Sequence, residues 1–158
     1  MSRNDDAERE EVRRLAANLF NRTWELLDLE DRSPDQDEEM VHAAHASRYH
    51  WGIVGTPINF ARGDWQIARV YAVLGRGDPA MHYASRYLEA CESKDFGPFD
   101  LAFACEGMAR SLVANGDIAA ATEHLGLAVQ AGAKIPEDDD RAWLIKNLEQ
   151  IRSLIGAS

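Results

Sequence analysis

The amino-acid sequence predicts an all-α fold. Alanine, the strongest helix former, occurs 24 times among the 158 residues, whereas Val, Ile and Thr together occur 18 times. No segment alternates apolar and polar residues in the sustained way that a half-buried strand requires. Proline and glycine stand where helices would begin and end. We therefore expect helices joined by loops and no sheet.

The first two expected helices are separated by an acidic link. Residues 30–39 contain Pro34 and many carboxylates, so we expect a solvated and mobile loop there. Gly52 and Gly55 follow the second helix, because glycine readily takes the left-handed conformation that closes a last turn.

The middle helices begin at prolines. Pro57 follows Thr56 and Pro79 follows Asp78. Proline has no backbone amide proton, and the side chain of Thr or Asp before it can cap the free amides at the start of the helix. Pro98 opens the next helix in the same position after a glycine. Glycines end these helices after amphipathic runs, namely Gly75, Gly77, Gly116 and Gly132.

The last helix begins at the acidic run 137–140, because negative charge is favoured at a helix N-terminus. We expect it to cover the end of the fold with an apolar stripe, formed by Trp143, Leu144, Leu148, Ile151 and Leu154. The chain is long enough for one domain, expected over 1–158. Its expected helices are 6–30, 37–52, 57–75, 78–93, 98–115, 117–132 and 139–155.

Composition argues against several classes of function. Seventeen basic residues against 27 acidic ones give a net charge of −10, the wrong sign for a nucleic-acid partner. No apolar stretch is long enough to cross a membrane, and the N-terminus is charged, so a cytoplasmic protein is expected. Cys91 and Cys105 lack a C-x-x-C spacing and are expected to be reduced and buried. No cofactor is expected.

An internal repeat is visible when the chain is aligned with itself so that Gly75 falls on Gly116. The same alignment superposes Ile67-Ala68-Arg69 on Met108-Ala109-Arg110. It also superposes Ala80 on Ala121, a small residue where two helix backbones would approach closely. We expect helix pairs that stack side by side and share a core. The pairs are 57–93 and 98–132, preceded by an irregular first pair, 6–52, and followed by the capping helix 139–155.

These residues resemble the tetratricopeptide repeat (TPR) family. The run 116–121 with Leu125 and Ala128 looks like that family's glycine turn, alanine contact and second-helix core positions. The resemblance covers roughly 57–132, and departs from the family in the extra Gly77, a period longer than about 34 residues and a poorly fitting first pair. It implies a TPR-like solenoid whose first helix in each pair lines a concave peptide-binding groove.

Helix 57–75 carries a polar stripe that supplies the first candidate site. Asn59, Arg62, Gln66 and Arg69 recur at helical spacing on one face. Positions that match the groove of the resembled family are Arg62, Trp65, Arg69, Phe103, Glu106 and Arg110. Two arginines on adjacent helices can hold a carboxylate, and the alternative is an internal ion pair with Glu106 or Asp64.

Helix 37–52 carries the second candidate. Glu38, His42, His45 and Tyr49 fall on one helix face, and carboxylate and imidazole suit a divalent transition metal. The alternatives are a polar cluster at the rim of the groove, with Arg48, or hydrogen-bonded helix packing.

The sequence thus favours a non-catalytic protein-binding or peptide-binding module. Its expected partner offers an acidic group to Arg62, Trp65, Gln66, Arg69, Glu106 and Arg110, with His42, His45 and Arg48 at the rim. The competing hypothesis is a small helical enzyme or metal protein built on Glu38, His42, His45 and Tyr49. Self-association into a homo-oligomer is a third possibility.

Overall fold

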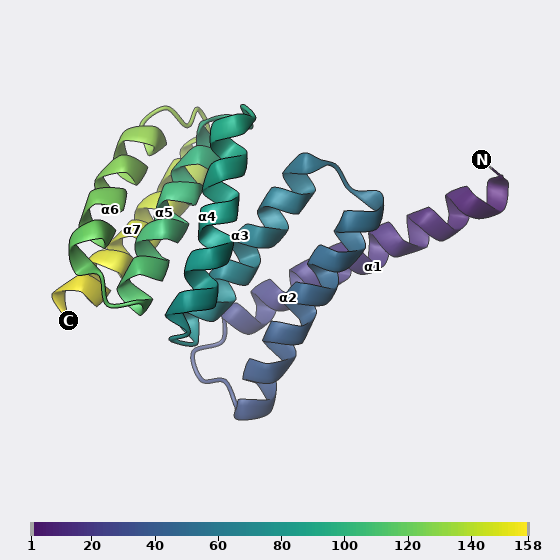
Figure 1. Ribbon diagram of the computed structural model, residues 1–158, viewed down its shortest axis with the longest axis horizontal. Coiled ribbons are helices and arrows are strands. Elements are labelled where there is room, and N and C mark those ends of the chain that lie inside the picture. Colours follow the sequence, from purple (N-terminus) through teal and green to yellow (C-terminus); the bar gives the residue numbers. More distant parts are fainter. Residues whose placement is uncertain (1, 158) are drawn as a thin grey trace.

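The computed structural model describes residues 2–157, and helices joined by loops make up this range (Figure 1). The predicted single domain, 1–158, therefore includes two terminal positions that lie outside the described residues. Within the described part there are seven helices and no strand, as the composition predicts. They are α1 (Arg3–Leu27), α2 (Pro34–Val54), α3 (Pro57–Val73), α4 (Gly77–Ser93), α5 (Pro98–Ala114), α6 (Ile118–Gly132) and α7 (Asp138–Gly156).

Each helix packs on the next one along the chain, so helices that are consecutive in sequence lie side by side. The odd-numbered helices also touch one another, α1 with α3, α3 with α5 and α5 with α7. Within the described residues the backbones of the even-numbered helices do not come close to one another, although side chains meet, as His45 of α2 and Tyr83 of α4 do with ring centroids 5.6 Å apart. The four odd-numbered helices therefore come together as one layer, and the even-numbered helices lie outside it.

Local chemistry explains where the helices begin. Pro34, Pro57 and Pro98 each stand at the first helical position, where the missing amide would have no partner. Before α3, the side-chain oxygen of Asn59 accepts a hydrogen bond of 2.9 Å from the amide of Thr56.

Several of the expected boundaries are wrong. The first expected helix, 6–30, spans Arg3–Leu27 instead, because Ser2 caps its start by accepting a hydrogen bond from the amide of Asp5. Asp78 lies inside the first turn of α4 and does not cap it, because this helix begins at Gly77. The expected loop 30–39 is mostly helix: Ser33 accepts a hydrogen bond from the amide of Gln36, whose side chain binds the amide of Ser33 in return. Two of the acidic residues that suggested a loop, Asp35 and Asp37, lie in the first turn of α2, where the helix dipole favours them.

The internal repeat has a structural counterpart in two equivalent helix ends. Gly75 and Gly116 have φ values of 73° and 83°, the left-handed conformation. After each glycine the next amide reaches back across the turn, from Arg76 to the carbonyl of Tyr71 (2.8 Å) and from Asp117 to that of Leu112 (2.9 Å). Ala80 and Ala121, also equivalent, are both fully buried, as expected for close helix contacts.

The extra glycine at Gly77 also has a physical reason. A β-carbon at this position would lie 2.7 Å from the α-carbon of Asn115, in the turn between α5 and α6. Only glycine lets the start of α4 approach this turn so closely. The departure from the resembled repeat therefore marks a contact between neighbouring helix pairs.

These turns support a prediction with a matched control. We expect Gly116→Ala to lower the free energy of unfolding by about 1 kcal/mol, because an alanine must adopt a left-handed conformation there. A β-carbon meets no atom within 4 Å at Gly116 or at Gly126, which lies in the middle of α6. Gly126→Ala should instead stabilise by about 0.5–1 kcal/mol. Urea denaturation of both variants tests this, and equal effects would contradict it.

The largest core cluster has an aromatic centre and lies between α3, α4, α5, α6 and α7, with Trp24 of α1 packed against it. Trp65 occupies its centre, with ring centroids of Trp24 and Phe103 at 5.4 and 5.3 Å. Trp143 on α7 packs on the same group, at 4.6 Å from Phe103. This cluster joins the first and last helices of the chain through the middle ones.

In the described part, no helix has both the length and the apolar character needed to traverse a bilayer.

Candidate functional site

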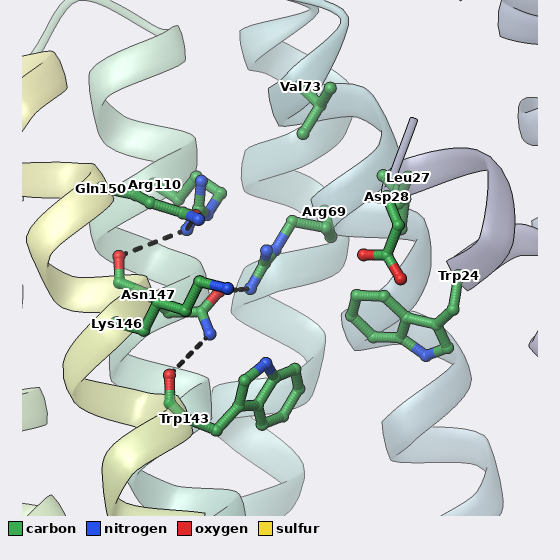
Figure 2. Close-up of a pocket in the computed structure, with 10 residues that line it drawn as sticks. All are labelled: Trp24, Leu27, Asp28, Arg69, Val73, Arg110, Trp143, Lys146, Asn147 and Gln150. Atoms are coloured by element: carbon green, nitrogen blue, oxygen red, sulfur yellow. Dashed lines mark hydrogen bonds between the residues drawn. The ribbon is translucent and has the colours of Figure 1, made fainter. Parts of the chain in front are cut away.

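A pocket of about 430 Å³ opens on the layer of odd-numbered helices (Figure 2). Its floor is formed by α3 and α5, and its two sides by the end of α1 and by α7. We call it the arginine pocket. Its lining residues are Trp24, Leu27, Asp28, Arg69, Val73, Arg110, Trp143, Lys146, Asn147 and Gln150.

Two equivalent arginines of the repeat meet at the floor of this pocket. Arg69 and Arg110 share one carboxylate oxygen, Oε1 of Glu106, at 3.3 and 2.8 Å. The Glu106 side chain is fully buried, and the arginine side chains are only 9% and 8% exposed. The internal ion pair predicted as the alternative for these arginines is thus present. One buried carboxylate faces two guanidinium groups, so the cluster retains a net positive charge.

Burial makes the surroundings of Arg69 unfavourable for its positive charge. Burial lowers the pKa of Arg69 to about 10, partly offset by Glu106, so the group is still cationic at neutral pH. Its Nη2 donates to the side-chain oxygen of Asn147 at 2.8 Å, and its guanidinium lies 5.7 Å from the ring centre of Trp24. Its Nε is buried and has no hydrogen-bond partner within the described chain. The Nε–H group of Arg69 is therefore a hydrogen-bond donor beside the pocket that no acceptor of the described chain satisfies.

The rim of the pocket combines one more cation with aromatic surface. Lys146 is exposed on α7, and Trp143, 37% exposed, extends the apolar wall formed by Trp24. Asp28 on the opposite rim is the carboxylate among the lining residues. In a chain with a net charge of −10, three cations against this carboxylate and the underlying Glu106 make the pocket locally positive. Such a pocket attracts an anionic group.

Of the residues predicted to line the groove, only Arg69 and Arg110 line this pocket. Trp65 is only 4% exposed and packs in the aromatic core, so its expected contact with a ligand is wrong. Gln66 is 1% exposed, and its side-chain amide donates to the carbonyl of Phe20 on α1 at 2.9 Å. The polar stripe on α3 was correctly placed on one face, but α1 covers that part of it.

Arg62 lies apart from the arginine pocket. It binds both carboxylate oxygens of the buried Asp100, at 3.0 and 2.9 Å, and Tyr87 donates to the same carboxylate at 2.7 Å. The Asp100 carboxylate raises the pKa of Arg62, and burial, followed by this carboxylate, raises that of Tyr87. This network ties α3, α4 and α5 together and is separate from the site.

Arg48 is likewise paired internally. Its Nε donates to Asp64 at 3.1 Å, and Arg86 on α4 binds the other oxygen of the same carboxylate at 3.2 Å. Arg48 and Arg62 line two further hollows of the surface, so the structure does not bring all the predicted arginines into one groove.

Of the two predicted histidines on α2, His45 packs against α3 and His42 is exposed to solvent. The Nε2 atom of His45 is hydrogen-bonded to the hydroxyl of Tyr71 on α3 at 2.8 Å. Burial lowers the pKa of His45, which favours its neutral form. His42 is exposed, with Glu38 at 3.8 Å, and Tyr49 is 69% exposed. Over residues 2–157, no group of three or more His, Cys, Asp and Glu side chains is placed to hold a metal ion.

The two cysteines are free thiols, and Cys105 on α5 is buried as expected, whereas Cys91 on α4 is only partly buried. Burial raises the pKa of Cys91 to about 12 and that of Cys105 to about 11. Because the thiolate is the reactive form, we expect Cys105 in the folded protein to react with a disulfide reagent such as DTNB about 100-fold more slowly than in urea. A rate in the folded protein equal to the rate in urea would contradict this burial.

The half of the pocket that comes from α1 and α7 was not predicted from the sequence. Asp28, Lys146, Asn147 and Gln150 were not singled out, and Trp24 was not considered. These residues are far from the repeat in sequence, and Asn147 reaches Arg69 across 78 positions. The helical spacing of Trp143, Lys146, Asn147 and Gln150 was the one available signal, since it places them on a single face of α7.

Comparisons of the chain with protein-family models, with curated proteins and with solved structures gave no significant match.

Proposed function

We propose that this chain is a non-catalytic binding module that holds an acidic group of a partner protein or peptide in the arginine pocket. The observation that carries the proposal is the excess of buried positive charge at its floor, where Arg69 and Arg110 share the single carboxylate of Glu106. A hydrogen bond to a charged group contributes about 1.5–3 kcal/mol, so one carboxylate at this place makes a specific contact.

The shape of the pocket is in keeping with this proposal. Its volume of about 430 Å³ suits one or two side chains of a bound segment. Trp24 and Trp143 add apolar surface beside the cations, which suits a partner with an apolar residue next to the acidic one. We further propose that the stacked pairs form a TPR-like solenoid that acts in the cytoplasm, with its odd-numbered helices facing the partner.

Charge reversal at the rim tests this function without disturbing the buried ion pairs. The probe is a fluorescein-labelled acidic peptide selected on the full chain from a displayed random library. We expect Lys146→Glu to weaken its binding at least about tenfold, the equivalent of losing one charge-assisted contact. Lys134→Glu is the matched control. It changes the net charge by the same amount, and Lys134 is also exposed but lies between α6 and α7, outside the arginine pocket.

A second peptide tests whether binding depends on the carboxylates of the first one. The same peptide with each Asp and Glu replaced by Asn and Gln should lose most of its affinity. Equal weakening by Lys146→Glu and Lys134→Glu would mean that only net charge matters, and binding unaffected by Lys146→Glu would place the peptide elsewhere. Either result would overturn the proposed site.

A further inference from the structure

The outward face of α7 carries an arrangement of charges that is complementary to itself. Asp138, Arg141, Ile145, Glu149 and Arg152 recur at steps of three and four residues, and so share one stripe of this helix. Ile145, at the centre, is 53% exposed. Asp138 stands seven residues before it and Arg152 seven after, while Arg141 stands four before and Glu149 four after.

We propose that this stripe, the α7 stripe, is an interface at which a second copy of this chain binds antiparallel. A two-fold axis through Ile145 places Asp138 opposite Arg152 of the other copy, and Arg141 opposite Glu149. Each pair occurs twice because the interface is symmetric, which gives four ion pairs around two facing isoleucines. The partner is thus another molecule of the same protein.

The charge pattern selects one register. Shifting the second helix by three residues in one direction brings Arg141 opposite Arg152, and shifting it in the other brings Asp138 opposite Glu149. A parallel arrangement sets every charge opposite its own copy. Because like charges that face each other are destabilising, only the antiparallel pairing centred on Ile145 satisfies all four residues.

The four charged side chains of the α7 stripe can still form ion pairs with a second copy. Glu149 and Arg152 are exposed and take part in no ion pair or hydrogen bond within the described residues. Arg141 is held in place by the carbonyls of Ile135 and Pro136, so its charge is fixed beside the stripe. Asp138 already contacts Arg141 and is exposed enough to reach a second arginine.

Apolar surface lies along the same edge. A hollow of about 270 Å³ between α6 and α7 is lined by Val129, Leu144, Ile145 and Leu148, with Arg141 and Arg152 at its sides. Val129 is 45% exposed, so an isoleucine of the second copy gains apolar contact beside the axis. The arginine pocket remains open, because Trp143, Lys146, Asn147 and Gln150 lie on another face of α7.

The first test is the mass of the 158-residue protein as its concentration rises, measured by sedimentation velocity. Because one helix pair is a small interface, we expect a reversible dimer with a dissociation constant in the micromolar range. Ile145→Asp should raise this constant at least about tenfold, since it places two carboxylates together on the axis. Leu127→Asp, at a 42% exposed leucine on α6, is the matched control and should leave it unchanged.

The second test addresses the register. Asp138→Arg and Arg152→Asp should each weaken the dimer, and the double variant should restore it, because the charges then face each other with exchanged signs. Under mild oxidation with diamide, Ile145→Cys should give a covalent dimer, whereas Glu149→Cys should not, because its thiols are far apart across the axis. Wild-type protein controls for the native cysteines.

A single-chain mass at every concentration overturns the proposal. So does a dimer that Ile145→Asp leaves intact, which would place the interface elsewhere. A dimer weakened by both single charge reversals but not restored by the double variant, or cross-linked equally at positions 145 and 149, would overturn the antiparallel register. Thermal unfolding of each variant confirms that the chain is folded during these measurements.

Discussion

Replacing Glu106 with glutamine is expected to lower the free energy of unfolding by about 3 kcal/mol. The reason is that Glu106 is the carboxylate shared by Arg69 and Arg110, and all three side chains are buried. Without its charge, two guanidinium groups remain in a region of low polarity with only neutral partners such as Asn147. Removing one member of a buried ion pair costs more than the pair itself contributes, because an unpaired charge is left behind.

Urea denaturation of the wild type and of Glu106→Gln measures this loss. Glu123→Gln is the matched control, since Glu123 is exposed on α6, and it should change the free energy of unfolding by less than about 0.5 kcal/mol. The same Glu106→Gln variant should bind an acidic peptide more tightly where it is folded, because the pocket loses a negative charge. A loss of stability below about 1 kcal/mol would show that Glu106 does not compensate the two arginines.

Most helix starts and the repeat could be predicted because they depend on local chemistry. A proline at the first helical position or a glycine in the left-handed conformation leaves the same signal wherever it occurs, as at Pro57 and Gly116. The start of α2 lies earlier than predicted although Ser33-Pro34 has the same form, because the acidic residues after it are also typical of a loop. Acidic residues in a first helical turn point the other way.

The candidate site could be predicted only in part, for a different reason. The internal repeat made Arg69 and Arg110 equivalent positions on neighbouring helices, and Glu106 was named as their alternative partner. Their depth was not predictable, because it is set by how closely α1 and α7 approach α3 and α5. For the same reason Trp65 was expected on the groove, whereas Trp24 and Trp143 cover it.

Trp65 is the position at which truncation should disturb core and pocket together. We expect Trp65→Ala to lower the free energy of unfolding by about 4 kcal/mol, because the indole is 4% exposed and its loss leaves a large cavity. Its ring lies 5.7 Å from that of Tyr87 and 6.0 Å from that of Trp143, in addition to Trp24 and Phe103. Helices α1 and α7 would both lose the surface on which their pocket-lining tryptophans rest.

Two further variants separate the cavity from other effects. Trp65→Phe should cost less than half as much, because it keeps a ring and removes an indole Nε1 that is buried without a hydrogen-bond partner in the described chain. Trp51→Ala removes a tryptophan of α2 that is only partly buried, and should also cost less than half as much. A Trp65→Ala variant as stable as Trp51→Ala would contradict the central place of Trp65. Because Arg69, Arg110 and Lys146 are unchanged in Trp65→Ala, any loss of acidic-peptide binding in its folded fraction measures how far the aromatic core positions the walls of the arginine pocket.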